Sequence, residues 1–209
     1  MSAMPVENFI LRSSLTSPFV RKVRMAADVL GLAQRIKLVP TDAVDPNDSL
    51  RRQNPLGKYP CLVCEDGTAV YDSSVIIEFL QDVAGTDRLL PRSGPERIAM
   101  LTRTRLADGI IDAGAAVIYE ERYHGPTQRS SHWLDYQRDK ILRALAAFEG
   151  RPPDPHRTNA VSIGLSCALG FLDRRQPVAW RTPCPGLVQW LAAFERHEPA
   201  FDRTRPPPP

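Results

Sequence analysis

The order of apolar patterns over residues 8–84 restricts the possible fold more than any other feature. Residues 9–11 are a short apolar run typical of a buried strand, and apolar residues recur at helical spacing over residues 19–30. In residues 36–38, apolar and charged side chains alternate, as in a second strand. A strand, a helix and a strand in this order predict a parallel pair with a right-handed crossover.

The next two apolar runs predict a hairpin. Residues 61–63 and 69–71 flank Asp66-Gly67, a dipeptide that favours a tight turn between antiparallel strands. Apolar residues at helical spacing over residues 75–80 then indicate a second amphipathic helix. A mixed four-stranded sheet with helices packed on it accounts for all these segments. We therefore expect an α/β domain over residues 8–84.

The remainder of the chain carries no strand signal. Residues 85–95 are rich in Gly, Pro and charge and lack an apolar period, which predicts a linker. We expect residues 96–204 to form an all-α helical bundle and residues 205–209 to be a solvated polyproline tail. The helical patterns of the bundle cover residues 98–123, 134–148, 161–172 and 187–196, and the third is apolar nearly all round, which predicts a central position.

Composition argues against several classes of function. The net charge is only +3 and the basic residues are scattered, which is a poor footprint for nucleic acid. No apolar run approaches the roughly 18 residues of a membrane span, and residues 1–9 do not resemble a signal peptide. The histidines show no metal-ligand spacing, and the cysteines (Cys61, Cys64, Cys167 and Cys184) do not resemble a secreted disulfide framework. We expect a cytoplasmic protein without a metal.

The most informative motif, Ser17-Pro18-Phe19, lies where the first strand gives way to the first helix. Ser17 is a good N-cap, and unpaired N–H groups with the positive end of the helix dipole suit an anion there. Arg21, Lys22 and Arg24 have the sign that a helix start disfavours, and an anionic partner would relieve this. Two simpler interpretations stay open: Ser17 only caps the helix, and the basic side chains only reach water.

Two further motifs lie at strand ends. Pro60 directly precedes an apolar strand, cannot donate to the sheet and can be cis, although the sequence leaves the isomer open. In a cis turn the Tyr59 backbone N–H and C=O would be free to pair with an extended peptide. Asp72 and Ser73 lie at a strand-to-helix junction, where a carboxylate and helix-start N–H groups could receive an amino-acid headgroup. Turn and cap roles are the alternative for these two residues.

These three motifs, in this order and at these intervals, resemble the cytosolic glutathione S-transferase family. The resemblance spans nearly the whole chain, because residues 166–173 are similar to the central helix of the family's C-terminal domain. Residues 106–114 are similar to a small bacterial subgroup whose substrates are poorly defined, here of the serine type. The resemblance implies a thioredoxin-like glutathione-binding domain at residues 8–84, followed by the family's helical domain.

The resemblance also implies roles for individual residues. By position, Ser17 matches the family's catalytic hydroxyl or cysteine. Tyr59 and Pro60 match the turn whose backbone pairs with the cysteinyl unit of glutathione. Asp72 and Ser73 match the pair that binds its γ-glutamyl end. A glutathione transferase with these residues would activate the thiol as a thiolate for attack on a small apolar electrophile, with glutathione as co-substrate and no metal.

Other implications of the resemblance are a homodimer and a role in detoxification. Tyr119 and Tyr123 could line the pocket of the electrophile, or could be ordinary helix packing. Two other functions stay open: a catalytically idle glutathione-binding or protein-interaction module, and a glutathione-dependent isomerase, dehalogenase or peroxidase. Sequence does not separate conjugation from these last three reactions.

Two motifs could be mistaken for redox or structural signals. Thioredoxin-like redox enzymes carry C-x-x-C at the first helix start, whereas residues 17–20 of this chain contain no cysteine, which excludes dithiol exchange there. Cys61 and Cys64 do match C-x-x-C, but residues three apart on a strand face opposite sides and should not meet. The central helix begins with Asn159 and Ser162, where the family has a cap ending in Asp, so we expect a weaker helix start.

Overall fold

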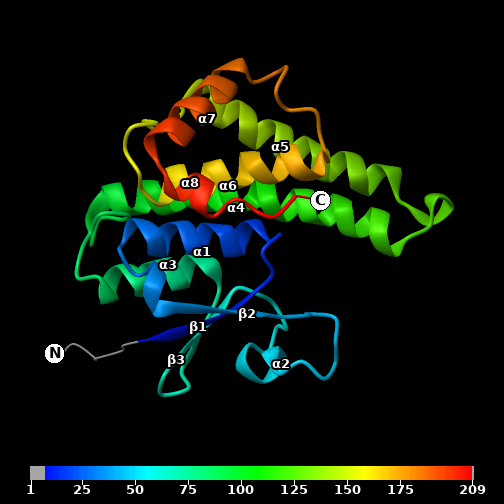
Figure 1. Cartoon of the computed structure of the whole chain (residues 1–209). Coiled ribbons are helices and arrows are strands. Elements are labelled where there is room, and N and C mark those ends of the chain that lie inside the picture. The colour runs from blue at the N-terminus through cyan, green and yellow to red at the C-terminus, as the bar shows by residue number, and fades with distance from the viewer. Residues whose placement is uncertain (1–7, 209) are drawn as a thin grey trace. The chain divides into compact units, whose positions relative to one another are not determined.

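The computed structural model describes residues 8–208, which fall into two compact units (Figure 1). The first unit contains the described residues up to Gly94 together with those from Ala200 onward, and the second is Pro95–Pro199. The sequence predicts residues 96–204 as one helical domain, whereas the contacts group residues 200–204 with the first unit. The expectation about a signal peptide falls mostly on residues 1–7, outside the described range, as does the last proline of the tail.

The first unit is built on a mixed sheet of four strands in the order β2-β1-β3-β4. β1 (Phe9–Ser13) pairs parallel with β2 (Ile36–Pro40) and antiparallel with β3 (Cys61–Cys64). β3 pairs antiparallel with β4 (Ala69–Val70), and Gly67 in their turn has a φ of +85°, which favours glycine. The thioredoxin-like α/β class, the parallel pair and the hairpin are therefore confirmed.

Helices cover both faces of this sheet. α1 (Pro18–Val29) and α3 (Ser73–Val83) pack on one face (Figure 1). The other face carries α2 (Leu50–Gln53), which the sequence did not predict, and a single 3₁₀ turn, η1 (Ala33–Arg35), precedes β2. Alternation along the strands divides the apolar side chains between the faces. The core under α1 and α3 includes Phe9, Leu11, Val20, Val23, Leu62, Ile76 and Leu80, and that under α2 consists of Leu50, Cys61 and Val63.

The second unit is helical throughout. It contains α4 (Gly94–Tyr123, whose first residue belongs to the first unit), α5 (Ser131–Gly150), α6 (Ala160–Arg175) and α7 (Pro185–His197), with a short 3₁₀ turn, η2 (Pro126–Gln128), between α4 and α5. α6 is buried at 12 of its 16 residues, which confirms its central position within this unit. The four predicted helical patterns therefore all correspond to helices.

The start of α6 is fully capped, contrary to the expectation of a weak start. The Asn159 side chain accepts hydrogen bonds from the backbone N–H groups of Val161 and Ser162. In return, the Ser162 hydroxyl accepts from the Asn159 N–H at 2.9 Å. Ser162 thus takes the part of the missing acid in a reciprocal capping box.

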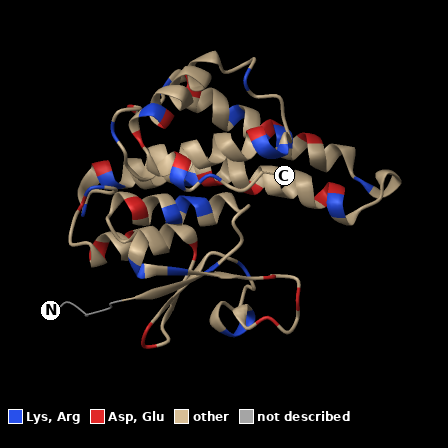
Figure 2. Cartoon of the chain, viewed as in Figure 1, with Lys and Arg blue, Asp and Glu red and all other residues tan. Residues whose placement is uncertain are grey.

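Charges are distributed over most elements of both units. Figure 2 shows Lys and Arg interspersed with Asp and Glu along the helices, as the scattered sequence pattern predicts. Among the helices that the structure describes, none combines the length and the apolar character needed to cross a bilayer.

Candidate active site

The strand register brings the three sequence motifs to one end of the sheet. Arg12 of β1 lies opposite Cys61 of β3, and Leu62 of β3 lies opposite Val70 of β4. In antiparallel pairs the end of one strand lies beside the start of the next. The loop that leads to Ser17, the turn before β3 and the chain that leaves β4 therefore meet at the same end.

Ser17 caps α1. Its hydroxyl oxygen accepts a hydrogen bond from the Val20 N–H at 3.3 Å, and its own N–H donates to the Ser14 carbonyl at 3.0 Å. The capping interpretation is therefore confirmed. It is compatible with a second role, because a hydroxyl has two acceptor lone pairs and one donor hydrogen, and the cap uses an acceptor only.

For Arg21 and Lys22, the interpretation that the basic side chains of α1 only reach water is wrong. The two side chains are buried instead of reaching water. The Arg21 guanidinium donates to the Phe201 backbone carbonyl at 2.8 Å and lies 4.0 Å from the centroid of the Phe201 ring. Lys22 Nζ donates to the Ser74 hydroxyl at 3.2 Å. The two cations therefore form hydrogen bonds within the first unit, and they give no support for a bound anion.

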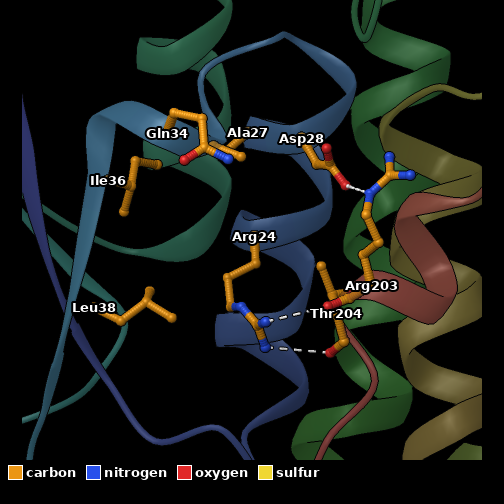
Figure 3. A pocket seen from close by; sticks show the side chains of 9 residues that line it. Arg24, Ala27, Asp28, Gln34, Ile36, Leu38, Arg203 and Thr204 are labelled. Carbon is orange, nitrogen blue, oxygen red and sulfur yellow. Dashed lines mark hydrogen bonds and ion pairs between the residues drawn. The ribbon is translucent and has the colours of Figure 1, made fainter.

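Arg24 is half-buried beside α8 (Ala200–Arg203), and burial, together with the nearby charge of Arg21, lowers its pKa. Figure 3 shows its guanidinium bonded to the carbonyls of Arg203 and Thr204, next to an ion pair between Asp28 and Arg203 at 2.7 Å. These groups border a cavity of about 210 Å³ in the first unit. Its other lining residues are Ala27, Ala33, Gln34, Ile36 and Leu38, so it is separate from the three motifs.

The turn before β3 is held by a buried asparagine. The Tyr59–Pro60 bond is cis. Asn54, only 2% exposed, donates through Nδ2 to the Lys58 carbonyl at 2.7 Å and accepts from the Leu56 N–H at 3.1 Å. The peptide that leads into Tyr59 is therefore fixed in place by side-chain bonds.

Asp72 and Ser73 form the start of α3. The Asp72 carboxylate accepts hydrogen bonds from the N–H groups of Ser74 at 2.8 Å and Val75 at 3.4 Å, which confirms the capping alternative. Asp72 nevertheless lies exposed, whereas Ser73 is buried. A carboxylate at the surface beside a helix start can bind an ammonium, and the first N–H of the helix, that of Ser73, can receive a carboxylate. The Tyr71–Asp72 bond is also cis.

Tyr119 and Tyr123 belong to α4 in the second unit. They are 50% and 61% exposed, and their ring centroids lie 6.0 Å apart. Neither ring packs in the helical core, so core packing does not account for them.

Cys61 and Cys64 face opposite sides of the sheet, as predicted, because they belong to the two separate cores. Both thiols are free and buried, and burial raises the pKa of each. Both side chains pack in the apolar cores on either side of the sheet, as small apolar residues do. Within residues 8–208 no cluster of three His, Cys, Asp or Glu could hold a metal ion.

Sequence reasoning missed Arg12 and Asn54, which organise the chain before Tyr59. Arg12 is 6% exposed and ion-paired with Asp48. A charged residue within an otherwise apolar strand run was the available signal, because such a charge needs a buried partner. For Asn54 the available signal was the sequence Asn54-Pro55-Leu56-Gly57, in which an asparagine, a proline and a glycine are typical of a turn.

Comparison with known proteins agrees with this geometry. The family model for the glutathione S-transferase N-terminal domain matches residues 16–83. The uncharacterized GST-like protein YibF of Escherichia coli K12 is 34% identical, over 94% of this chain and 98% of that protein. A glutathione transferase family member from Pseudomonas fluorescens Pf-5, solved with bound glutathione, is 38% identical and superposes with a TM-score of 0.88 over 96% of this chain and 100% of its own.

Further solved structures extend the comparison. The same Pseudomonas protein was also solved with S-(propanoic acid)-glutathione, with a TM-score of 0.84 at the same identity and coverage. A glutathione S-transferase from Methylobacterium radiotolerans in complex with glutathione sulfonate is 31% identical, with a TM-score of 0.86 over 97% of this chain and 96% of its own. With relatives of this identity and coverage, the chain belongs to the glutathione S-transferase family.

Proposed function

We propose that this chain is a serine-type glutathione transferase of the bacterial subgroup. The observation that carries the proposal is the strand register, which places Ser17, the Tyr59–Pro60 turn and Asp72 at one end of the sheet. The glutathione bound to the Pseudomonas relative and the glutathione sulfonate bound to the Methylobacterium relative support glutathione as the co-substrate.

Each motif has a part in binding the tripeptide. The Tyr59 backbone pairs with the cysteinyl unit in the manner of a short strand, next to Pro60, which cannot donate. The Asp72 carboxylate receives the γ-glutamyl ammonium. Ser73 receives the γ-glutamyl carboxylate through its own N–H and hydroxyl groups, because the Ser74 and Val75 N–H groups bond Asp72. This arrangement leaves the sulfur beside the Ser17 hydroxyl.

Ser17 then stabilises the thiolate. A free thiol has a pKa of about 8.5, and lowering it by about two units corresponds to roughly 2.7 kcal/mol. A hydroxyl hydrogen bond to an anion contributes about 1.5–3 kcal/mol, and the dipole of α1 adds about 0.3–1 kcal/mol. These two sources are sufficient for the shift. The thiolate attacks an electrophilic carbon, a carbon–sulfur bond forms, and the displaced pair goes to the leaving group or to the acceptor carbon.

The electrophile in this proposal is small and apolar, with Tyr119 and Tyr123 as candidate contacts. The Pseudomonas structure with S-(propanoic acid)-glutathione supports formation of a carbon–sulfur bond at the glutathione sulfur as the reaction class, because its ligand carries a group on that atom. The proposal includes a cytoplasmic homodimer with a role in detoxification. Sedimentation of a monomer at micromolar concentration would contradict the dimer.

The test of Ser17 compares two substitutions. Ser17→Ala removes both the hydroxyl donor and the helix cap, at a cost of about 1 kcal/mol in stability, whereas Ser17→Gly costs only a few tenths. Both variants should bind glutathione and should raise the pKa of its bound thiol by about 1–2 units. Titration of the thiolate absorbance of each binary complex measures this.

Comparing Ser17→Ala with Ser17→Gly separates the loss of the hydroxyl donor from the loss of the helix cap. Equal titration shifts in both variants assign the effect to the hydroxyl, while a shift in Ser17→Ala alone would assign it to fraying of α1. Ser14→Ala is the matched control, because Ser14 supplies a neighbouring hydroxyl that bonds Thr16 at 3.2 Å. An unchanged titration curve in all three variants removes Ser17 from the mechanism and favours an idle binding module.

A further inference from the structure

A buried arginine in the central part of the sheet has no role in the mechanism above. Arg12 lies on β1 with its side chain only 7% exposed, on the sheet face away from α1 and α3. Removing a charge from water is costly unless hydrogen bonds and an ion pair compensate for it. The position of Arg12 therefore depends on what its guanidinium contacts.

Its side-chain hydrogen bonds and its ion pair run to one segment, the chain between β2 and the turn before β3. The guanidinium uses every one of its nitrogens, and the planar fork of arginine suits several fixed acceptors at once. Nε donates to the Thr41 hydroxyl at 2.9 Å, Nη1 donates to the Ser49 hydroxyl and the Gln53 side chain at 2.7 Å each, and Nη2 pairs with Asp48 at 2.5 Å.

This segment has few other anchors. Of residues 41–53 only Leu50 is buried, and residues 44–47 are all exposed. The same Asp48 carboxylate also accepts from the N–H groups of Leu50 at 2.7 Å and Asp42 at 3.1 Å. The hydrogen bond from the Leu50 N–H is the main reason that the pKa of Asp48 lies below its usual value, and the charge of Arg12 acts in the same direction. Arg12 and Asp48 therefore add polar anchors to the small apolar core under α2, to which this segment contributes Leu50 as its one buried residue.

The segment leads directly to the Tyr59 backbone. Asn54 directly follows α2 and ends it, and its backbone N–H donates to the Leu50 carbonyl at 2.7 Å. Its side chain then holds the Lys58 carbonyl, which belongs to the peptide that leads into Tyr59. A continuous set of hydrogen bonds thus joins Arg12, through α2 and Asn54, to the proposed glutathione contact.

We propose that Arg12 is a positioning residue of the glutathione site, acting through α2 and Asn54 on the Tyr59 backbone. This inference rests on the proposed function, since it concerns the same site. Arg12 bonds to the segment of residues 41–53, and it affects the affinity for glutathione only through that segment. Ser17 lies on the strand-to-helix junction and is held by α1, so the thiolate-stabilising part of the site does not depend on Arg12.

The test replaces the guanidinium but keeps its charge. Arg12→Lys retains one cation but cannot reach four acceptors. Glutathione should bind about tenfold more weakly, because small displacements of a positioning group are costly. The pKa of the bound thiol should stay at the wild-type value, and hydrogen exchange should accelerate at residues 41–58. Asp48→Asn, which keeps the size of the side chain, should give the same pattern and serves if Arg12→Lys does not fold.

A control separates positioning from general stability. Arg203→Lys removes the same fork from an ion pair in the same unit, with Asp28 on α1, and should leave glutathione affinity unchanged. Wild-type affinity in both Arg12→Lys and Asp48→Asn, or a thiol pKa that shifts together with the affinity, overturns the inference. Failure of the wild-type protein to bind glutathione refutes the proposed function itself, and the positioning role with it.

Discussion

At the scale of single residues, the proposed site is built from side chains that also start helices. Ser17 accepts from the Val20 N–H, and Asp72 accepts from the Ser74 and Val75 N–H groups. Capping alone explains why these residue types occur at these positions. A loss of activity in a simple alanine variant therefore does not separate a ligand contact from a frayed helix. Useful variants must keep the cap while removing the chemical group under test.

Asp72 allows such a separation. Asparagine caps a helix as well as aspartate does, so Asp72→Asn should keep the thermal stability of the protein. It removes the negative charge, and glutathione should bind about three- to tenfold more weakly, a modest effect because the carboxylate is exposed. Asp72→Ala should show the same weaker binding and also lose about 1 kcal/mol of stability. Calorimetric titration and thermal unfolding measure the two effects. Wild-type affinity in Asp72→Asn would exclude a charge contact with the ligand.

At the scale of elements, the sequence predicted what periodicity can express. Every segment with two or more turns of apolar spacing is a helix in the structure, and the four strands lie where short apolar runs are found. α2 and α8 were missed because four residues are too short to show a 3.6-residue period. Of the site, the three motifs could be named because each follows or precedes a strand. The Arg12 network could not, since its partners lie 29 to 41 residues away without a local pattern.

Two glycines of α4 give a matched prediction for this helix. A Cβ at Gly114 would meet Phe171 of α6 at 2.6 Å, whereas a Cβ at Gly109 would meet nothing within 4 Å. Gly114→Ala should destabilise the protein by about 1–2 kcal/mol, because an overpacking cost of about 1–3 exceeds the gain in helix propensity. Gly109→Ala should stabilise it by about 0.5–1 kcal/mol. Urea unfolding of both variants measures these changes in stability. Stabilisation by Gly114→Ala would show that Phe171 of α6 moves aside at little cost.

At the scale of the whole molecule, the chain leaves the first unit at Gly94 and returns to it at Ala200. The returning segment is received by the basic residues of α1. Arg21 donates to the Phe201 carbonyl and Arg24 to the Thr204 carbonyl, positions some 180 residues further along the chain. No local pattern in the sequence predicts such a contact. The sequence therefore showed an excess of positive charge at a helix start and not the carbonyls that compensate it.

The C-terminal segment should accordingly stabilise the first unit. Phe201 is 3% exposed, with the Arg21 guanidinium 4.0 Å from its ring centroid. Phe201→Ala removes a buried ring and should cost about 3–5 kcal/mol in the free energy of unfolding. Removal of residues 200–209 should cost at least as much, because the Asp28–Arg203 ion pair is lost too. Removal of residues 206–209 alone is the control and should be nearly neutral, since it retains α8 and Thr204. Urea unfolding measures all three, and a stable protein without residues 200–209 would show that the first unit holds together without α8.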